Sequence, residues 1–453
     1  MSADISAPRL KMPWWTSPVG LTLGFLLPVI VFISFIGETN HPGLTIRGTR
    51  FLGIGYVAMG VAMLLSMALA AWIALRVTST QPAFVDRSRW NLAATTLGVI
   101  GFVAMTIWFK DFLTNPGLLW QVLSGRFKPE REDIELTTGI TSLANFVPIF
   151  FAIYAFQMRE AGARLPWYMH LLCSVLVAFT LFRVYVWSER LALIEAIIPF
   201  GLVLGARAWS SRNRVLKFMA FLGPFVALPA LVLYFGIAEY SRSWASGVYS
   251  QLDFWDFAVG RFASYYYTAL NNGAGLLATT EWPNYKFDSI FSWLHRAPLS
   301  VGQVFGSLTN VAIPNVDHDI FLARFADVEF NSPSALYSVV GDIGLPLAFV
   351  YFSLCAALAG FLFVRYQQGR LPGVALYPMF FISYLEIFRY PYLGQSRAFT
   401  PMVGFILVLL IVHADRLLGR PARSTEPGEP VIDDSARASF SPEFSSATGQ
   451  MRK

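Results

Sequence analysis

Charge and cysteine are scarce in this 453-residue chain. Asp, Glu, Lys and Arg make up 14% of it, against about 25% in ordinary globular proteins. The two cysteines, Cys173 and Cys355, both lie in apolar runs, which excludes a disulfide framework or a cysteine metal cluster. Walker, HExxH and Gly-x-Ser-x-Gly motifs do not occur, and Gly53-x-Gly55-x4-Gly60 lies in an apolar run, where it predicts close helix packing. A soluble enzyme and a secreted disulfide-rich scaffold are therefore excluded.

Apolar and aromatic residues are abundant instead. Hydrophobic residues make up 55% of the chain, with 40 Phe, 18 Tyr and 13 Trp, more than one water-soluble core would hide. About 20 mainly apolar residues cross a bilayer core, and they must be helical because the backbone finds no water there. We predict an all-α polytopic membrane protein with ten transmembrane helices. The predicted spans are residues 19–36, 52–75, 92–109, 141–157, 168–186, 190–208, 215–236, 336–364, 372–388 and 398–413.

Basic residues between these spans predict the orientation of the chain. Cytoplasmic loops are enriched in Lys and Arg. With the N-terminus in the cytoplasm, the N-terminal segment and the even-numbered loops carry 13 basic residues and only three acidic ones. The net charge of +6 therefore indicates topology and not a nucleic-acid surface. The first span follows Arg9 and Lys11 but ends without a small-x-small cleavage site, which predicts a retained helix rather than a signal peptide.

The spans divide the chain into five parts. These are a cytoplasmic N-terminus (1–18), transmembrane helices one to seven (19–236), a large periplasmic loop (237–335), transmembrane helices eight to ten (336–415) and a disordered cytoplasmic tail (416–453). The loop contains aromatic, amphipathic stretches at 249–267 and 287–295. Because Tyr and Trp favour the membrane interface, both stretches are predicted as surface helices at the headgroup level, compatible with a lid or floor of a substrate groove.

Ionisable residues of the spans lie at one depth. The first four spans contain none. The charges embedded in later spans beyond their end residues are Arg183, Glu195, Asp342 and Glu386. Arg190 starts the sixth span, and Arg389 and Arg397 bracket the short loop between the last two. At ~1.5 Å per helical residue, the predicted orientation places all of them within about 10 Å of the outer interface. Charges within a bilayer are costly, so we predict a polar site at the outer face.

Two simpler explanations of these charges stay open. Arginines near helix ends can snorkel to the interface, although the positive-inside rule disfavours basic residues in short outer loops. Arg190 and Glu195 can also pair with each other and only lock two helices together. The sequence alone does not separate these explanations from a binding site.

Clustered arginines at an outer leaflet fit an anionic lipid headgroup. A guanidinium group binds two phosphate oxygens at once and stays charged when partly desolvated. The N-terminus of the sixth span, just after Ser188, adds backbone N–H groups. No nucleotide sugars are supplied outside the cytoplasmic membrane, so a glycosyl transfer there must use a lipid diphosphate as its leaving group.

The large loop supplies further candidate residues. His318 has a pKa range suited to a general base, and a solvated loop histidine is the alternative. Asp317-x-Asp319 has the form of a metal-bound nucleotide-sugar motif, but such sugars are absent on this side, so neither a metal nor a cofactor is predicted. Arg261 and the aromatic run that starts at Tyr265 also lie in this loop.

Three segments resemble the oligosaccharide-repeat-unit polymerases, the O-antigen polymerases of the Wzy type. They are residues 188–199 (SERLALIEAIIP), 332–346 (SPSALYSVVGDIGLP) and 388–394 (FRYPYLG). The first is similar to that family's arginine-led start of a mid-chain helix, the second to the helix after its large outer loop, and the third to its last outer turn. With the span layout, the resemblance extends over residues 15–415 and implies a GT-C-like fold.

The resemblance implies a glycosyltransferase of the bacterial inner membrane, with its active site facing the periplasm. It would transfer a growing O-antigen or exopolysaccharide chain from undecaprenyl diphosphate to a newly flipped repeat unit. The implied catalytic residues are Arg190, Glu195, His318 and Asp342, and the implied substrate-binding residues are Arg183, Arg261, Tyr265, Glu386, Arg389 and Arg397. The implied partners are the undecaprenyl diphosphate-linked oligosaccharide, the lipid bilayer, a chain-length regulator and a flippase, and no nucleic acid.

Two other functions stay open at this stage. An O-antigen ligase shares the span count, the large loop and the arginine chemistry, but attaches finished glycan to another acceptor. A flippase or other transporter should carry charges near the bilayer midplane along a path to both sides. A non-catalytic membrane partner is the simplest alternative to all of these.

Overall fold

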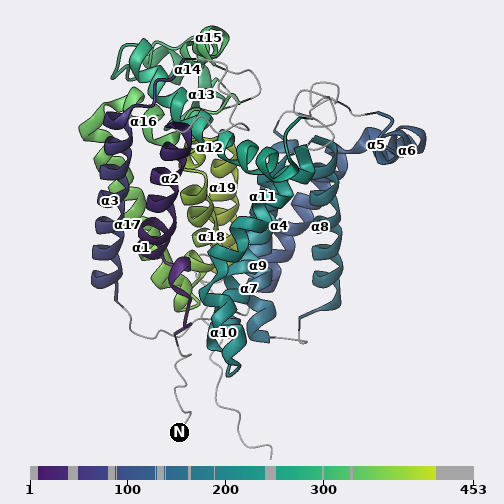
Figure 1. The fold of residues 1–453 in the computed structure, drawn as a ribbon. Coiled ribbons are helices and arrows are strands. Elements are labelled where there is room, and N and C mark those ends of the chain that lie inside the picture. The colour runs from purple at the N-terminus through teal and green to yellow at the C-terminus, as the bar shows by residue number, and fades with distance from the viewer. Residues whose placement is uncertain are drawn as a thin grey trace, which may run out of the picture.

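The fold is a helical bundle with extra helices at one end (Figure 1). The structure is a computed structural model that describes residues 9–38, 49–79, 87, 89–127, 129, 137, 139–161, 165–187, 189–239, 251–297, 300–326 and 330–414. All regular structure in these residues is helical. The end that carries α12 (Phe254–Thr279) to α16 (Ala335–Ile343) is called the loop end. The opposite end, where the described chain begins, is called the N-terminal end.

Within the described ranges, seven helical segments are long and apolar enough to cross a membrane. They are Pro18–Gly37, which comprises α1 (Pro18–Leu21), a π-helical turn and α2 (Leu27–Glu38); α3 (Ile54–Val77); α4 (Trp90–Trp108); Thr141–Arg159, which includes most of α7 (Val147–Ala161); α8 (Trp167–Trp187); Leu191–Ser210 of α9 (Arg190–Ser210); and α17 (Leu345–Gln367). α10 (Arg214–Phe221) and the Gly223–Tyr234 part of α11 (Gly223–Glu239) reach this length only together, and the pair is bent by 63°, as in a broken span or a re-entrant loop. Two shorter apolar helices are α18 (Leu371–Leu385) and α19 (Ser396–Val412).

The described helices confirm an all-α fold and are consistent with a polytopic membrane protein. Each of the ten predicted spans has an apolar helix at its position, but among the described residues only seven single segments reach spanning length, so the count of ten stays a prediction. The predicted span at 336–364 is wrong in its extent. Gly344, with φ +79°, ends α16, and the spanning helix α17 begins at Leu345. A residue with a side chain rarely adopts this conformation, so glycine allows the break.

The surface of α3 shows why these helices suit a bilayer. Met67 and Ala71 are buried, and the helix packs most extensively on α17. Leu65, Leu69 and Trp72 lie about half-exposed on other sides of the same helix. Apolar side chains all around a helix would be unfavourable in water but are expected where lipid covers the outer face. The same pattern indicates a lipid environment for the whole bundle.

The aromatic stretch of the large loop forms α12, which is buried for most of its 26 residues. Near its N-terminus α12 packs against Gly236 of α11, and Tyr267 lies against Gly37 of α2. Further along, Asn271 Oδ1 accepts hydrogen bonds of 2.8 and 3.0 Å from two backbone N–H groups just before α3. The helix therefore crosses the loop ends of three spans. The stretch predicted as a surface helix over 249–267 is helical from Phe254, and its position at the headgroup level stays a prediction. The contacts of α12 with α15 (Val316–Phe325) and α16 include Gly275 and Gly273, further along the helix.

The rest of the described loop is built from short helices. Of the stretch predicted as a helix over 287–295, only α13 (Ser292–His295) is helical. Trp293 stacks on Phe399 of α19, with ring centroids 3.9 Å apart, and so fastens the loop to the bundle. Of the other short helices, α14 (Val301–Leu308) belongs to this loop. The helices α5 (Lys110–Thr114) and α6 (Pro116–Leu123) instead follow α4. The predicted disordered tail at 416–453 lies outside the described residues.

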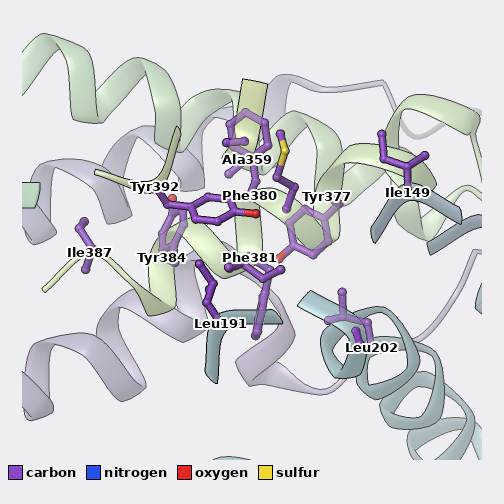
Figure 2. Close-up of a cluster of buried hydrophobic side chains, with 14 of the residues drawn as sticks. Ile149, Leu191, Leu202, Ala359, Tyr377, Phe380, Phe381, Tyr384, Ile387 and Tyr392 are labelled. Atoms are coloured by element: carbon purple, nitrogen blue, oxygen red, sulfur yellow. The ribbon is translucent and has the colours of Figure 1, made fainter. Parts of the chain in front are cut away.

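A dense aromatic layer supports the loop end from below. Figure 2 shows Tyr377, Phe380, Phe381 and Tyr384 of α18 packed among side chains from neighbouring helices, and Tyr392 follows in the turn after α18. These side chains are 5% exposed or less. Close packing of this kind resists displacement, so the turn at residues 386–397 is held on a rigid base.

Candidate active site at the loop end

Buried charges gather at the loop end. Within the described ranges, the charged side chains classed as buried are Arg183, Glu195, Arg261, Asp342 and Glu386. They come from helix ends that face this side, or from α12, which crosses it. A buried charge is costly unless it is paired and hydrogen-bonded, so the partners of these five residues define the candidate site.

The first group of charges, called the Glu195 cluster, contains Arg183, Glu189, Glu195, Tyr392 and Arg397. Arg397 donates to both carboxylate oxygens of Glu195, from Nε and Nη2, each at 2.8 Å. The Tyr392 hydroxyl donates to Glu195 Oε1 at 2.8 Å. Glu189 Oε1 accepts from Arg397 Nη1 at 2.6 Å and from Arg183 Nη2 at 2.7 Å. Two carboxylates therefore hold two arginines in fixed orientations.

An aromatic stack supports Arg183 from the other side. Its guanidinium carbon lies 4.5 Å from the ring centroid of Trp108, at the end of α4. Trp108 in turn stacks on Trp187, with ring centroids 5.3 Å apart. A guanidinium group over an indole ring is favourable, more so when water is excluded. The cluster thus ties together the loop ends of α4, α8, α9 and α19.

The second group, called the Arg389 cluster, joins the turn after α18 to α12. Arg389 Nη1 donates to Glu386 Oε2 at 2.6 Å, and Nη2 donates to the Tyr265 hydroxyl. The ring centroid of Phe330 lies 6.2 Å from that of Tyr265 and 4.6 Å from the guanidinium carbon of Arg261. Four residues from the bundle and from α12 therefore converge, with Phe330 as their aromatic cover.

Some buried polar atoms of this second cluster and of α12 have no described hydrogen-bond partner. Arg389 Nε is buried and has no hydrogen-bond partner in the part of the chain that the structure describes. The same holds for Ser264 Oγ and Thr268 Oγ1, which share one face of α12 with Arg261 at helical spacing. Most buried polar groups in proteins are hydrogen-bonded. Each of these three atoms can therefore still form a hydrogen bond to water or to a polar ligand.

The two clusters form one site. Glu386 lies close enough to Arg397 and Glu195 for their charges to act on it, although its direct partner is Arg389. Tyr390 interacts electrostatically with charged residues of both clusters. The arrangement can hold an anion at a fixed place and stabilise negative charge that develops there.

Asp342 serves a different purpose. Its Oδ2 accepts hydrogen bonds from the backbone N–H groups of Ser289 and Ile290, at 2.7 and 3.2 Å. Burial, helped by the nearby charge of Asp288, raises the pKa of Asp342 to about 7, and the two N–H donors oppose this shift. None of its described contacts is with an arginine. Asp342 therefore fastens the loop segment around Ser289 and Ile290 to α16.

His318 lies on α15, which packs on α12. Its ring is hydrogen-bonded to the backbone of Asn331, the residue after Phe330, and its Nε2 has no hydrogen-bond partner among the described residues. Burial lowers the pKa of His318, and the neighbouring Asp319 only partly opposes this effect. The imidazole is therefore neutral near pH 7 and able to accept a proton.

The structure brings together most of the residues predicted from the sequence. Arg183, Glu195 and Arg397 meet in one cluster, and Arg261, Tyr265, Glu386 and Arg389 meet in the other. Arg190 begins α9. The structure does not describe its side chain, so the suggested pair of Arg190 with Glu195 stays a prediction.

Three members of the site were missed at the sequence level. Glu189 stands next to Arg190, and its charge in a short outer loop was the available signal. Tyr392 lies within the segment 388–394, in which only Arg389 was predicted to be a site residue. Phe330 gave no signal, because an aromatic residue in a long loop has no recognisable period.

No group of three or more His, Cys, Asp or Glu side chains in the described ranges could hold a metal ion. In comparisons with known proteins, no family model, no curated protein and no solved structure matches the chain. Arguments about function therefore depend on the geometry of the site and on the chemistry of its residues.

Proposed function

We propose that the chain is a membrane glycosyltransferase that polymerises lipid-linked repeat units, with the loop end at the outer face of the bacterial inner membrane. The observation that carries this proposal is the environment of Arg389. Its guanidinium is buried, is oriented by Glu386 and Tyr265, and keeps one donor, Nε, without a described partner. A buried, preoriented guanidinium with a donor to spare is suited to a phosphate oxygen.

The substrate that fits best is an undecaprenyl diphosphate-linked oligosaccharide. Arg389 binds the diphosphate and stabilises its growing charge as the bond to the first sugar breaks. The hydroxyl group of the acceptor sugar forms the new bond to that carbon, and its proton passes to a base. His318 suits this role better than Glu195 or Asp342, because both carboxylates are occupied by fixed donors.

The distribution of charge supports a transferase over a transporter. A transport path needs polar groups across the bilayer midplane. In the described ranges the buried charged side chains lie at the loop end, while the interior below them is apolar and aromatic (Figure 2). An O-antigen ligase would use the same geometry. A deletion strain separates the two, since polymerase loss leaves one repeat unit attached to the acceptor and ligase loss leaves none.

An Arg389→Ala variant tests the proposal in cells. We expect single-repeat products and a loss of long chains on a glycan gel, because removing a donor that stabilises a developing anion slows such reactions about 10²- to 10³-fold. Arg389→Lys should restore little of the polymerisation, because an ammonium group cannot reproduce the paired, planar N–H donors of a guanidinium group. Arg365→Ala, in the last turn of α17 and so at the opposite end of the bundle, is the matched control. An unchanged ladder in Arg389→Ala, at wild-type protein levels in the membrane, would rule out this role.

A further inference from the structure

A separate cavity of about 590 Å³ lies beyond the C-terminal end of α12. It is lined by the last residues of α12, the segment after them, and one side of α15. The lining residues used below are Thr279, Thr280, Glu281, Asn284, Lys286, Asp317, Ile320, Phe321, Arg324 and Phe325. This volume is in the range typical of small-molecule sites. The cavity shares no lining residue with the Glu195 or Arg389 cluster.

Hydrogen bonds hold the polar wall of this cavity in place. Thr279 and Thr280 donate to backbone carbonyl groups of α12 at 2.7 and 2.6 Å, which directs their hydroxyl oxygens as acceptors. Lys286 Nζ lies 2.5 Å from Asp317 Oδ2 across the cavity. Asn284 Oδ1 accepts from the Lys286 backbone N–H at 2.9 Å. The donors and acceptors are therefore oriented before anything binds.

The charges and the apolar surface of the cavity indicate the kind of ligand. Two acidic residues, Glu281 and Asp317, balance two basic residues, Lys286 and Arg324, so the cavity has no net attraction for a diphosphate. Ile320 on α15 is 46% exposed and, with the partly buried Phe325, offers a small apolar patch. Many fixed hydrogen-bonding groups beside an apolar patch suit a sugar, which has hydroxyl groups at its rim and C–H groups on its faces.

We infer that this cavity binds part of the glycan, at a distance from the reacting bond. Along α12, Tyr265 and Thr279 are separated by about 21 Å, at ~1.5 Å per residue. A chain of several sugars that ends at Arg389 therefore reaches the cavity, whereas a single sugar does not. The inference rests on the proposed function and extends it, because it gives the enzyme a second binding site for its glycan.

Binding measurements test the inference without any need for catalysis. The probe is the oligosaccharide released by mild acid from the surface glycan of the cells that make the protein, titrated calorimetrically into the purified full-length chain. We expect the double variant Glu281→Gln/Arg324→Ala to bind at least tenfold more weakly, because it loses hydrogen bonds to charged groups. Ile320→Trp, which places a bulky ring in the cavity, should also weaken binding at least tenfold.

Matched controls on the same loop separate this effect from a general disturbance. Arg296→Ala removes another exposed charge, and Val304→Trp adds the same bulk to exposed α14. Both controls should bind the oligosaccharide like the wild type. No binding to the wild type, or equal affinity in the cavity variants and the controls, would overturn the inference.

Glycan gels then distinguish this inference from the proposed function. Cavity variants should still join two repeat units but give shorter chains, whereas Arg389→Ala should join none. If the wild type binds the oligosaccharide at the cavity yet never joins repeat units, the proposed function fails and the cavity stands. If it polymerises, and the cavity variants bind and polymerise equally well, only the inference fails.

Discussion

At the scale of single residues, the loop end is a set of charges that depend on one another. Arg397 makes hydrogen bonds to Glu195 and Glu189, and the Glu195 side chain is only 5% exposed. Burying such a pair costs desolvation, which its attraction only partly offsets, so the pair contributes position more than stability. Removing one partner alone, however, leaves an uncompensated buried charge.

Glu195→Ala should therefore be strongly destabilising. We expect a loss of about 3–5 kcal/mol, because Arg397 would keep its charge and lose two of its three described hydrogen bonds. The measurement is thermal unfolding of the purified protein in detergent. The double variant Glu195→Leu/Arg397→Leu should be closer to the wild type, since it buries no charge. Equal unfolding temperatures for Glu195→Ala and the wild type would contradict this view of the cluster.

Asp342 should make stability depend on pH. Its pKa is raised to about 7 in the folded chain by burial, against about 3.9 when unfolded, so the folded state binds its proton more tightly. The stabilising effect is complete below pH ~4 and is lost as pH rises through ~7. Asp342→Asn, which does not titrate, should gain stability relative to the wild type over this range.

Unfolding temperatures between pH 4 and pH 8 check this prediction. Asp256→Asn, at an exposed position of α12, is the control and should follow the wild-type curve. If the difference in unfolding temperature between Asp342→Asn and the wild type stayed constant across this pH range, the pKa of Asp342 would not be raised in the folded state.

At this scale the sequence predicted kinds of residue better than their partners. Arg183, Glu195, Glu386 and Arg389 stand out because charge is rare in apolar runs. Which carboxylate meets which arginine depends on helix rotation and crossing, which hydropathy does not encode. Glu195 pairs with Arg397, which is 202 residues away in the sequence. Only the tertiary structure reveals this pair.

At the scale of helices, glycine positions the backbones. A Cβ at Gly360 of α17 would lie 2.8 Å from the Ala71 carbonyl oxygen of α3, in the most extensive helix pair of the bundle. The glycines predicted to pack closely in α3 differ in outcome. A Cβ at Gly60 would lie 2.8 Å from Ile30, whereas one at Gly53 or Gly55 would meet nothing within 4 Å.

Gly360→Leu should therefore separate α3 from α17. We expect a loss of about 1–3 kcal/mol or more, because a side chain would be forced against backbone in a packed interface. Gly55→Leu, at an open position of α3, is the matched control and should be near neutral. Thermal unfolding of the two variants decides the point, and equal behaviour would contradict close packing at Gly360.

Hydropathy predicted the positions of helices well and their burial poorly. Apolar length marks α3, α8 and α17 because the bilayer sets that length. The stretch that forms α12 has the polar and aromatic pattern of an interfacial helix, and nothing local reveals that α15 and α16 cover it. The break at Gly344 was missed because both sides of it are apolar.

At the scale of the whole molecule, one end of the bundle differs from the rest. The loop end combines two arginine clusters, a clamped outer segment and an open polar cavity, above an apolar and aromatic interior (Figures 1 and 2). Such one-sidedness fits an enzyme that meets a lipid headgroup at one leaflet and never moves it across.

The most direct test is a reconstituted reaction. Purified protein in liposomes is given undecaprenyl diphosphate-linked repeat units, and the products are followed by gel and by release of undecaprenyl diphosphate. The account predicts products of two or more repeats with one carrier released per bond formed, at a rate at least 10²-fold lower for Arg389→Ala. Translocation of the lipid-linked units without any joining, or equal rates in the variant, would contradict it.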